Sequence, residues 1–275
     1  MIKDIMQFRK LFFTLLFFAG VLSSLQTKAD HILGSDLSYK YLGANKYEFT
    51  LTYYGNCGST HFQNLVITNS IQLSYSSLSC NINGSFNITK VGSGVELSPI
   101  CPGLPTKCDP LHFNDGQPGI KKFSWTGTIT LPPCSDWVIS RKEAFRDDAV
   151  TTYDPLNQNI FMQATINNLA APVNSSPTFN SLAFAYLCSN KTNHISLGIS
   201  ENDGDALTYS LITPRTGQLP SQVISYFPGY SPGSPVTSGG LQINQANGDM
   251  SITPTQVGEI STTTILVEET RNGVV

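Results

Sequence analysis

The stretch Tyr47-Glu-Phe-Thr-Leu-Thr-Tyr53 decides the fold class of this chain. Its aromatic and aliphatic residues fall at alternate positions, and Glu and Thr occupy the positions between them. Successive side chains of a β-strand point to opposite faces, so this period of two predicts a half-buried strand. A helix would instead need apolar residues at every third or fourth position.

The same alternation recurs along the chain. Gly, Pro, Asn or Asp bounds each stretch, as expected for strands joined by turns. The further stretches lie at 71–75, 123–131, 160–166, 195–199, 207–211, 250–252 and 264–268. Their number and spacing predict an all-β protein built from β-sandwiches. Helical patterns are nearly absent, and for the charged stretch 141–150 a short helix and an exposed connection both remain open.

The amino-acid composition argues against several classes of protein. Only 13% of the 275 residues are charged, against about 25% in a typical soluble domain. Ser, Thr, Asn and Gln supply the remaining polarity, which argues against intrinsic disorder and against coiled coils. A net charge of −3 argues against a nucleic-acid partner held by a basic patch.

The N-terminus has the layout of a secretory signal peptide. Lys3, Arg9 and Lys10 precede the apolar run 11–22, and Thr27-Lys-Ala29 offers small residues for cleavage after Ala29. The run is too short for a membrane span, which needs about 20 apolar residues. We expect Sec-type export and removal of residues 1–29, which leaves a chain of net charge −6 with no transmembrane span.

All six cysteines lie in the exported part. An even number in an oxidising compartment predicts disulfides, and the spacing does not suggest zinc. Six cysteines allow 15 pairings; we favour Cys101 with Cys108, which would close a short Pro-rich loop. The candidates are Cys57, Cys80, Cys101, Cys108, Cys134 and Cys188.

A Pro- and Ser-rich stretch at 170–177 indicates a domain boundary. We therefore expect two domains. Residues 30–172 would form a β-sandwich stapled by disulfides, since five of the six cysteines lie there. Residues 173–275 have the length of one immunoglobulin-like sandwich.

Catalytic motifs are weak. Gly229-Tyr-Ser-Pro-Gly233 matches the nucleophile elbow of hydrolases. That elbow needs the backbone N–H of the residue after the serine, and here the residue is Pro232, which has none. The four histidines are scattered without metal-protease spacing. We expect a protein that is not an enzyme.

The stretch Glu201-Asn-Asp-Gly-Asp205 is the densest group of oxygen ligands. Two interpretations remain open. Glu201, Asp203 and Asp205 would bind Ca²⁺ at the domain junction, although their spacing is not that of an EF-hand. Alternatively, the Asp side chains bond the backbone of a Gly-containing turn between strands.

Two parts of the chain resemble known families. Residues 30–57, which begin Asp-His-Ile-Leu-Gly-Ser-Asp-Leu-Ser-Tyr, resemble the opening of large exported surface proteins of Bacteroidetes. These are labelled gliding motility-associated C-terminal domain proteins or PKD-domain proteins. The resemblance continues at 127–133, 164–168 and 174–179. This chain departs from the family at 141–148, where a Cys-Cys-Arg-Asn stretch is missing, and at Val173, where the family often has Cys.

The second resemblance lies in the second half. Residues 202–211, Asn-Asp-Gly-Asp-Ala-Leu-Thr-Tyr-Ser-Leu, are similar to a segment of cadherin-like or putative Ig repeats. The stretch 241–258 resembles the close of the same repeat. The resemblance implies an Ig- or cadherin-like second domain.

Together the resemblances imply a non-catalytic cell-surface or extracellular protein, adhesin-like and linked to gliding motility or attachment. Its partners would be other surface proteins or extracellular glycans. Such proteins end in a domain read by the type IX secretion system, so the chain would be the front of a longer protein or a short derivative. Two alternatives remain: a carbohydrate-binding module of a secreted enzyme, and a passive structural stalk. For the module, Trp137 is the candidate exposed aromatic residue, whereas Trp125 alternates with core residues.

Overall fold

Strands make up most of the regular structure. The computed structural model describes residues 32–271, except 102, 145 and 147, together with residue 273. The predicted signal peptide, residues 1–29, lies outside the described residues. The all-β prediction is confirmed, because the described part contains 14 strands, one α-helix and two short 3-10 helices.

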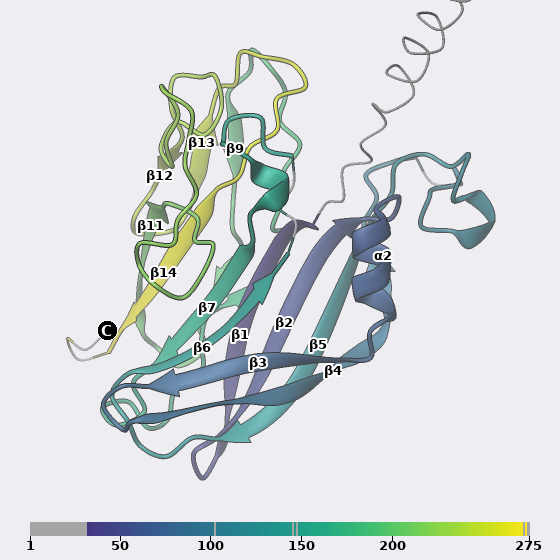
Figure 1. Ribbon diagram of the computed structural model, residues 1–275. Helices are drawn as coiled ribbons and strands as arrows, with labels where there is room; N and C mark the ends of the chain where they lie inside the picture. The colour runs from purple at the N-terminus through teal and green to yellow at the C-terminus, as the bar shows by residue number, and fades with distance from the viewer. Residues whose placement is uncertain (1–31, 102, 145, 147, 272, 274–275) are drawn as a thin grey trace, which may run out of the picture.

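The first region, residues 32–172, is built on one seven-stranded antiparallel sheet of order β1-β2-β5-β4-β3-β6-β7. Its strands are β1 (Ile32–Gly43), β2 (Lys46–Asn56), β3 (Ser70–Ser77), β4 (Ile82–Glu96), β5 (Ile120–Thr130), β6 (Trp137–Glu143) and β7 (Ile160–Ile166). The sheet is rolled, so that β3, β6 and β7 lie across β1, β2 and β5 (Figure 1) and β7 contacts β1. Two layers thus arise from one continuous sheet.

Strand β2 is central and follows the predicted alternation. Tyr47, Phe49, Leu51 and Tyr53 are fully buried, and β2 pairs with β1 on one side and β5 on the other. The interleaved Glu and Thr residues face away from the core, apart from Thr52, which is also buried. The prediction for this stretch is confirmed. Sequence alternation fixes which face of the strand becomes the core because a shift by one residue would expose every aromatic ring.

Both tryptophans lie inside the rolled sheet, with no exposed surface. Trp125 meets Tyr53 edge to face, and Trp137 meets Tyr75 in the same way. Each indole N–H donates to a backbone carbonyl: Trp125 to Thr68 and Trp137 to Pro132. Trp137 is therefore no exposed binding residue, and that prediction was wrong. It opens strand β6, whose alternation turns the indole inward.

A bulge bends β4 where it crosses from one layer to the other. The pairing of β4 with β5 shifts register between Val91 and Val95. Gly92 and Gly94 lie in this interval with φ of 66° and 80°, a region that L side chains rarely adopt. A Cβ at Gly94 would also approach Phe123 to 2.6 Å. The two glycines thus allow the kink that rolls the sheet.

The one α-helix among the described residues, α2 (Thr60–Ile67), has no counterpart among the sequence predictions. Ser59 caps it by accepting the N–H of Phe62 at 3.0 Å. Phe62, Leu65 and Val66 are buried against the sheet. At eight residues the helix is too short for a clear period, so packing rather than pattern stabilises it.

The charged stretch 141–150 contains no helix among its described residues. Its first three residues complete β6, where the Arg141 guanidinium bonds Tyr53 and the buried carboxylate of Glu143. Burial raises the pKa of the Tyr53 phenol, and the nearby Glu143 carboxylate adds to this. The described residues after β6 form an irregular connection in which Arg146 and Ala149 are buried. The connection is therefore only partly exposed: Arg146 is buried and paired, whereas Asp148 and Val150 are exposed.

The second region, residues 173–271, is built from much shorter strands in three small sheets. They pair as β8 with β10, as β11 with β14, and in the order β12-β13-β9. Their bounds are β8 (Thr178–Phe179), β9 (Asn193–Ile195), β10 (Ile199–Ser200), β11 (Ala206–Ile212), β12 (Gln242–Ile243), β13 (Met250–Ile252) and β14 (Thr264–Thr270); the 3-10 helices η1 (Pro110–His112) and η2 (Pro155–Asn157) belong to the first region. Between β11 and β12 the chain is irregular. Separate sandwich domains on either side of residue 172 remain a prediction.

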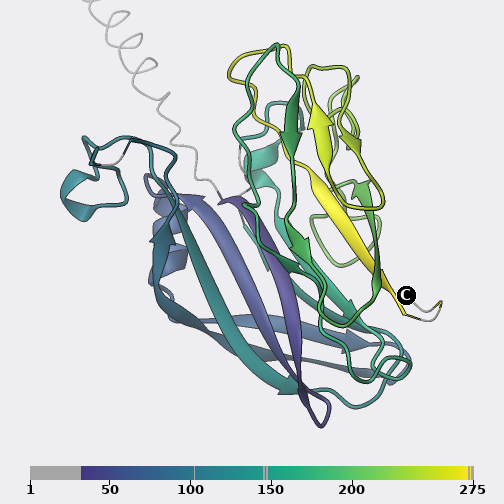
Figure 2. The same ribbon diagram turned by 180° about the vertical axis from the view of Figure 1, so that it is seen from behind.

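The two regions pack along β1 (Figure 2). Just after Pro172, Ser176 donates its N–H to Tyr39 O at 2.9 Å and accepts the N–H of Tyr39 at 2.8 Å. Ser175 accepts the N–H of Tyr41 at 3.2 Å. The expected linker therefore lies along an edge strand and satisfies part of its backbone, which protects an edge that would otherwise invite aggregation.

Arg146 joins the regions elsewhere. It is 5% exposed, and its guanidinium donates to Asn159 O, Thr262 Oγ1 and Arg215 O at 2.9, 3.2 and 2.7 Å. Burial lowers its pKa to about 10, although Tyr226 acts in the opposite direction. Two of its acceptors, Thr262 and Arg215, belong to the second region. Arg146 is therefore a buried cation at the contact between the two regions.

Candidate metal centre

The candidate metal centre lies where the second region begins and where its last strand ends. Strands β11 and β14 are antiparallel, and their register pairs Leu207 with Glu269 and Ala206 with Thr270. This pairing brings the acidic turn 201–205 beside residues 269–271. The segment 173–175 reaches the same place through its bonds to β1 and to Arg271.

Glu201 organises the turn. Its carboxylate accepts the backbone N–H groups of Asp203, Gly204 and Asp205 at 2.6, 2.6 and 2.8 Å. Gly204 has φ of 84°, which a glycine adopts without strain. Glu201 thus bonds the backbone of the turn, a role that the turn interpretation had given to the Asp side chains; Asp203 and Asp205 instead accept from Ser175 and Arg271.

Asp205 is already paired with a cation. Its side chain is 3% exposed, and its two oxygens accept from Arg271 Nε at 2.6 Å and Nη2 at 2.8 Å. This fork geometry is the strong form of an ion pair. Hydrogen bonding to Asp205 raises the pKa of Arg271. Arg271 also donates to Val173 O at 2.6 Å, so the pair ties β14 to the start of the region.

Three carboxylates meet at this point. Oxygens of Glu201, Asp205 and Glu269 all lie within 4.8 Å of one another. Asp203, the third predicted ligand, accepts the N–H of Ser175 at 2.5 Å and lies 3.9 Å from Arg271. The fold thus assembles two of the three predicted residues and adds Glu269. No local pattern distinguishes Glu269, because only the β11–β14 register places it here.

The pKa of Glu269 is affected by its burial and by the other carboxylates of the cluster. Its pKa is raised to about 7, mainly by burial and also by the charges of Asp205, Glu201 and Asp203, while the hydrogen bond from Asn174 acts in the opposite direction. Asn174 Nδ2 donates to Glu269 Oε2 at 3.2 Å and to Tyr39 Oη at 3.1 Å. A cation at this place would offset the repulsion that keeps the proton on Glu269.

Two buried oxygens beside the cluster accept no hydrogen bond from the described residues: Asn174 Oδ1 and Glu269 Oε1. Asn174 is only 8% exposed. Buried acceptors are nearly always satisfied in proteins, so these oxygens call for a partner. Ca²⁺ takes six to eight oxygen ligands, mixing carboxylates, amide carbonyls and water. Glu201, Asp205, Glu269 and Asn174 fit such a set, which the turn interpretation does not account for.

The disulfides in the structure differ from the pair that we favoured, Cys101 with Cys108. Cys57 bonds Cys108, and Cys80 bonds Cys134, whereas Cys101 and Cys188 are free and exposed. The predicted Cys101–Cys108 bridge is wrong. The loop between β4 and β5 folds back, so that Cys108 covers the end of β2, where Cys57 donates its N–H to Gly119 O at 2.9 Å.

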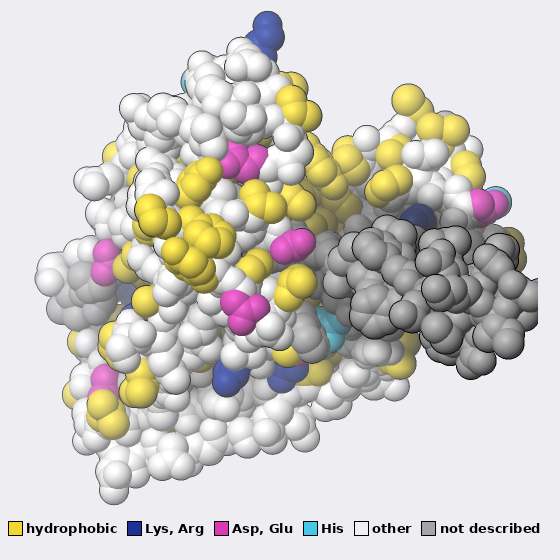
Figure 3. Space-filling view, turned by 45° about the horizontal axis from the view of Figure 1, so that its top comes forward, with side chains coloured by type: hydrophobic (Ala, Val, Ile, Leu, Met, Phe, Trp, Pro, Cys, Tyr) yellow, Lys and Arg dark blue, Asp and Glu magenta, His cyan; other side chains and the backbone are white. Residues whose placement is uncertain are grey.

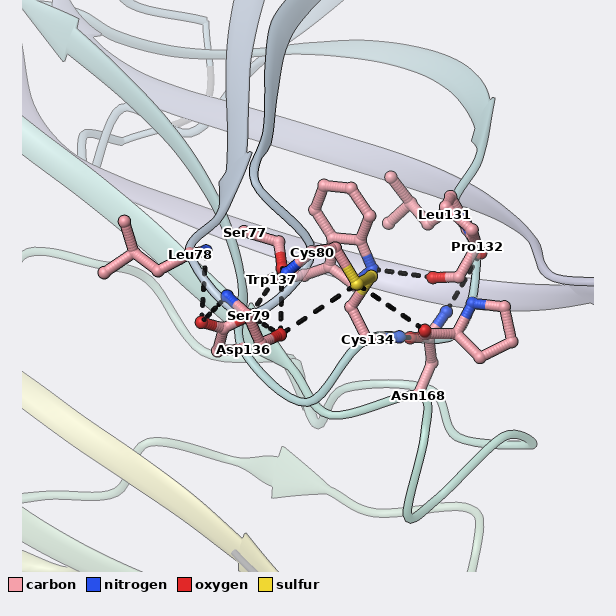
Figure 4. The surroundings of a disulfide bond; sticks show 11 residues. Ser77, Leu78, Ser79, Cys80, Leu131, Pro132, Cys134, Asp136, Trp137 and Asn168 are labelled. Carbon is pink, nitrogen blue, oxygen red and sulfur yellow. Dashed lines mark hydrogen bonds between the residues drawn. A yellow bond between two sulfur atoms is a disulfide. The ribbon is translucent and has the colours of Figure 1, made fainter.

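The second disulfide fastens the β3–β4 turn to the start of β6 (Figure 4). Asp136 stands beside it and accepts the hydroxyls of Ser77 and Ser79 at 2.5 and 2.6 Å, as well as the N–H of Ser79. These hydrogen bonds lower the pKa of the Asp136 carboxyl. The hydrogen bonds thus brace the turn, and the Trp137 indole lies next to the disulfide in Figure 4.

Comparison with models of protein families, with curated proteins and with solved structures gives no match for this chain. None of the helices in the described part of the chain has the length and hydrophobicity that a membrane span requires. The two disulfides indicate an oxidising compartment.

Proposed function

We propose that this chain is a non-catalytic exported protein of the cell surface or extracellular space that acts by adhesion and serves gliding motility or attachment. The observation that supports it is the pair of disulfides, since such bonds persist outside the reducing cytoplasm. The resemblance of residues 30–190 to gliding-associated surface proteins supports the kind of function. Other surface proteins or extracellular glycans are its partners in this proposal.

Adhesion requires that the two regions keep a fixed orientation. The Ser175 and Ser176 hydroxyls, which accept backbone N–H groups of β1, and the buried Arg146 supply part of this. In this proposal Ca²⁺ bound by Glu201, Asp205, Glu269 and Asn174 supplies the rest. The ion would join the turn before β11, the end of β14 and the segment after Pro172, and so hold the junction rigid.

The test compares cells that lack the gene with cells in which it is restored. Attachment to glass and spreading on agar are measured for both, with the purified chain added as a soluble competitor in a third arm. We expect deletion to reduce attachment and the competitor to inhibit it. Unchanged attachment and spreading after deletion would contradict the proposal. A change of reach without loss of adhesion identifies the passive stalk instead.

A second candidate, carbohydrate binding, has one favourable observation. Tyr186 is 70% exposed, and its ring meets that of Phe184 at 6.0 Å in a groove of about 400 Å³. An exposed aromatic ring next to polar side chains is a common sugar platform in proteins. Electrophoresis through gels that contain polysaccharides tests it with the wild type and Tyr186→Ala. Retention that the substitution abolishes supports this candidate, and no retention on any glycan removes it.

A further inference from the structure

Strand β9 lies at the edge of its sheet. In the order β12-β13-β9 it pairs with β13 on one side only. The other side of an edge strand presents backbone N–H and C=O groups to which a further extended chain can bond, and proteins usually cover such edges. The surroundings of β9 therefore decide what this edge can do.

Strand β9 belongs to a hairpin that is closed at both ends. At its base β8 pairs with β10, and Ser181 donates its N–H to Leu197 O at 3.4 Å. At its tip Asn193 accepts the N–H of Cys188 at 2.8 Å and donates to its carbonyl at 2.9 Å. The two arms are therefore held together at each end.

Between these ends the two arms differ in length. One has six residues, 182–187, and the other has three, 194–196. A regular ladder sets one residue opposite another, so the longer arm bows away from the shorter one. Among the described residues no backbone hydrogen bond joins 182–185 to 194–196. The hairpin is therefore open in its middle.

The groove of about 400 Å³ lies at this opening, lined by residues of both arms together with Leu97 and Pro99. Hydrophobic side chains gather in the hollow between the main body and the lobe formed by the β4–β5 loop, at the right of Figure 3. The four consecutive residues 193–196 all line the groove. Side chains of a strand alternate between its two faces, so an unbroken run indicates that the groove follows the edge of β9 rather than one face.

The backbone of His194 points away from β13. The turn between β12 and β13 closes through the N–H of Asn244, which donates to Asp249 O at 2.8 Å. Successive residues of a strand direct their backbone groups to opposite sides, so Ser251 bonds toward β12, as Asp249 does. His194 is opposite Ser251 in the register of β9, and its own N–H and C=O therefore face the outer edge. Neither group takes part in a backbone hydrogen bond among the described residues.

We infer that the groove captures an extended segment of a partner protein, which adds to the edge of β9 as a further strand. The inference rests on the proposed function, in which other surface proteins are partners. The N–H and C=O of His194 bond the backbone of the captured segment, as in other cases of strand addition. Alternate side chains of that segment pack against the apolar residues of the groove, among them Leu97, Leu182 and Phe184.

The lining specifies the kind of segment. The described residues around the groove include no Asp, Glu, Lys or Arg, and a buried charge without a partner is costly. The captured segment is therefore uncharged, with apolar residues at alternate positions. A peptide suits this edge better than a glycan, because its N–H and C=O groups recur at the spacing of a β-ladder.

Fluorescence anisotropy with the full-length exported protein tests the inference. The probe is a fluorescein-labelled heptapeptide in which Val alternates with Thr. The control peptide has the same side chains but N-methyl groups on all its backbone amides, so that neither edge can donate. We expect saturable binding of the first peptide and about tenfold weaker binding of the second, because the His194 carbonyl then lacks its donor. Exchange of the His194 amide proton, followed by NMR, is expected to slow in the first complex only.

Two variants locate the binding. Leu182→Asp introduces a charge into the groove and is expected to weaken binding of the first peptide about tenfold. Leu219→Asp is the matched control, since Leu219 is also exposed but lies outside the groove, and it should leave binding unchanged. Equal losses in both variants would overturn the inference.

The other outcomes are also decisive. The absence of saturable binding, or equal binding of the two peptides, would overturn the inference, because no strand pairing would then occur. Self-association of the free protein that Leu182→Asp abolishes would make a second copy the occupant instead, and retention on polysaccharide gels without peptide binding would make it a glycan. Peptide binding with unchanged attachment after gene deletion would retain strand capture and remove the adhesion proposal, whereas reduced attachment without peptide binding would do the reverse.

Discussion

The two regions of this molecule differ in the size of their buried cores, in the length of their strands and in their disulfides. Twenty described residues of the first region form a single buried cluster rich in aromatic rings. The corresponding cluster of the second region has four buried residues: Val236, Leu241, Met250 and Ile252. The first region has long strands and two internal disulfides, whereas the second has strands of two to seven residues.

The difference shows where each region obtains its stability. Burial of apolar area contributes about 25 cal/mol per Å², so a large continuous core stabilises the first region by itself. The second region has too small a core for that and relies on contacts to its neighbour, among them the bonds of Arg146 and Ser176. We expect the first region to fold without the second, but not the reverse.

The largest expected effect comes from the disulfides. The double variant Cys57→Ala/Cys108→Ala opens a bridge that spans 51 residues, and we expect a loss of about 4 kcal/mol in the free energy of unfolding. Both tryptophans of the chain lie in the first region, so urea unfolding followed by tryptophan fluorescence reports that region alone. Hydrogen exchange in β11 and β14 serves as the internal reference. A greater loss of hydrogen-exchange protection in β11 and β14 than in β2 would contradict the view that this bridge stabilises mainly the first region.

A matched pair of core substitutions tests the comparison directly. Leu73 has no exposed surface and Leu241 is 8% exposed. We expect Leu73→Ala to cost about 4 kcal/mol and Leu241→Ala about 2 kcal/mol, since the cost grows with the cavity left behind. Urea unfolding by fluorescence measures the first, and hydrogen exchange of β13 the second. Equal costs would mean that the small cluster is packed as tightly as the large one.

Calcium is expected to act on the second region. At a free concentration 100 times its dissociation constant it would add about 2.7 kcal/mol, which raises the melting temperature relative to EDTA. Glu269→Gln should reduce this shift. Glu268→Gln is the matched control, because the neighbouring position of β14 faces the other way and lies outside the carboxylate cluster. Identical melting temperatures with and without EDTA would remove the calcium site.

The smallest effect concerns pH in the absence of calcium. Burial raises the pKa of Glu269 from 4.5 to about 7, so the folded protein keeps a proton that the unfolded chain releases. The free energy of unfolding therefore falls as pH rises from about 4.5 to about 7. Glu269→Gln should lessen this fall in the second region, as followed by hydrogen exchange.

Asp36 provides the counterpart in the first region. Burial raises its pKa to about 6, although Lys122, Thr52 and Tyr54 act in the opposite direction. Asp36→Asn should lessen the pH dependence seen by tryptophan fluorescence and leave that of β11 and β14 unchanged. If either substitution alters both regions equally, they unfold as one unit rather than as two.

Sequence patterns predicted four of the seven strands of the first region, since β2, β3, β5 and β7 each overlap a predicted stretch, whereas β1, β4 and β6 had none. Helix α2 was not predicted, because eight residues with three buried side chains give no clear helical period. Trp137 was misjudged because a neighbouring aspartate suggests a surface, whereas β6 turns the indole inward. The predicted strand at 195–199 is wrong, because β9 ends at Ile195 and β10 begins at Ile199, with an irregular connection between them in which Gly198 has φ of 55°.

The candidate site was only partly visible in the sequence. Glu201 and Asp205 were identified because they lie close together along the chain. Glu269 and Asn174 were not, because one is brought by a strand pairing and the other by the packing of the linker on β1. The same holds for the disulfides: a short loop favoured Cys101 with Cys108, but the course of the β4–β5 loop decided for Cys57.

The sequence by itself determined the all-β class, the inward faces of β2 and β5 and the acidic turn, because these depend on alternation and on neighbours along the chain. Only the tertiary structure decided the roll of the sheet, the cysteine pairs, the burial of Trp137 and the carboxylate that completes the cluster. Those features depend on which residues meet across tens or hundreds of positions. Such meetings follow from strand register and from packing of the whole core, which no local pattern records.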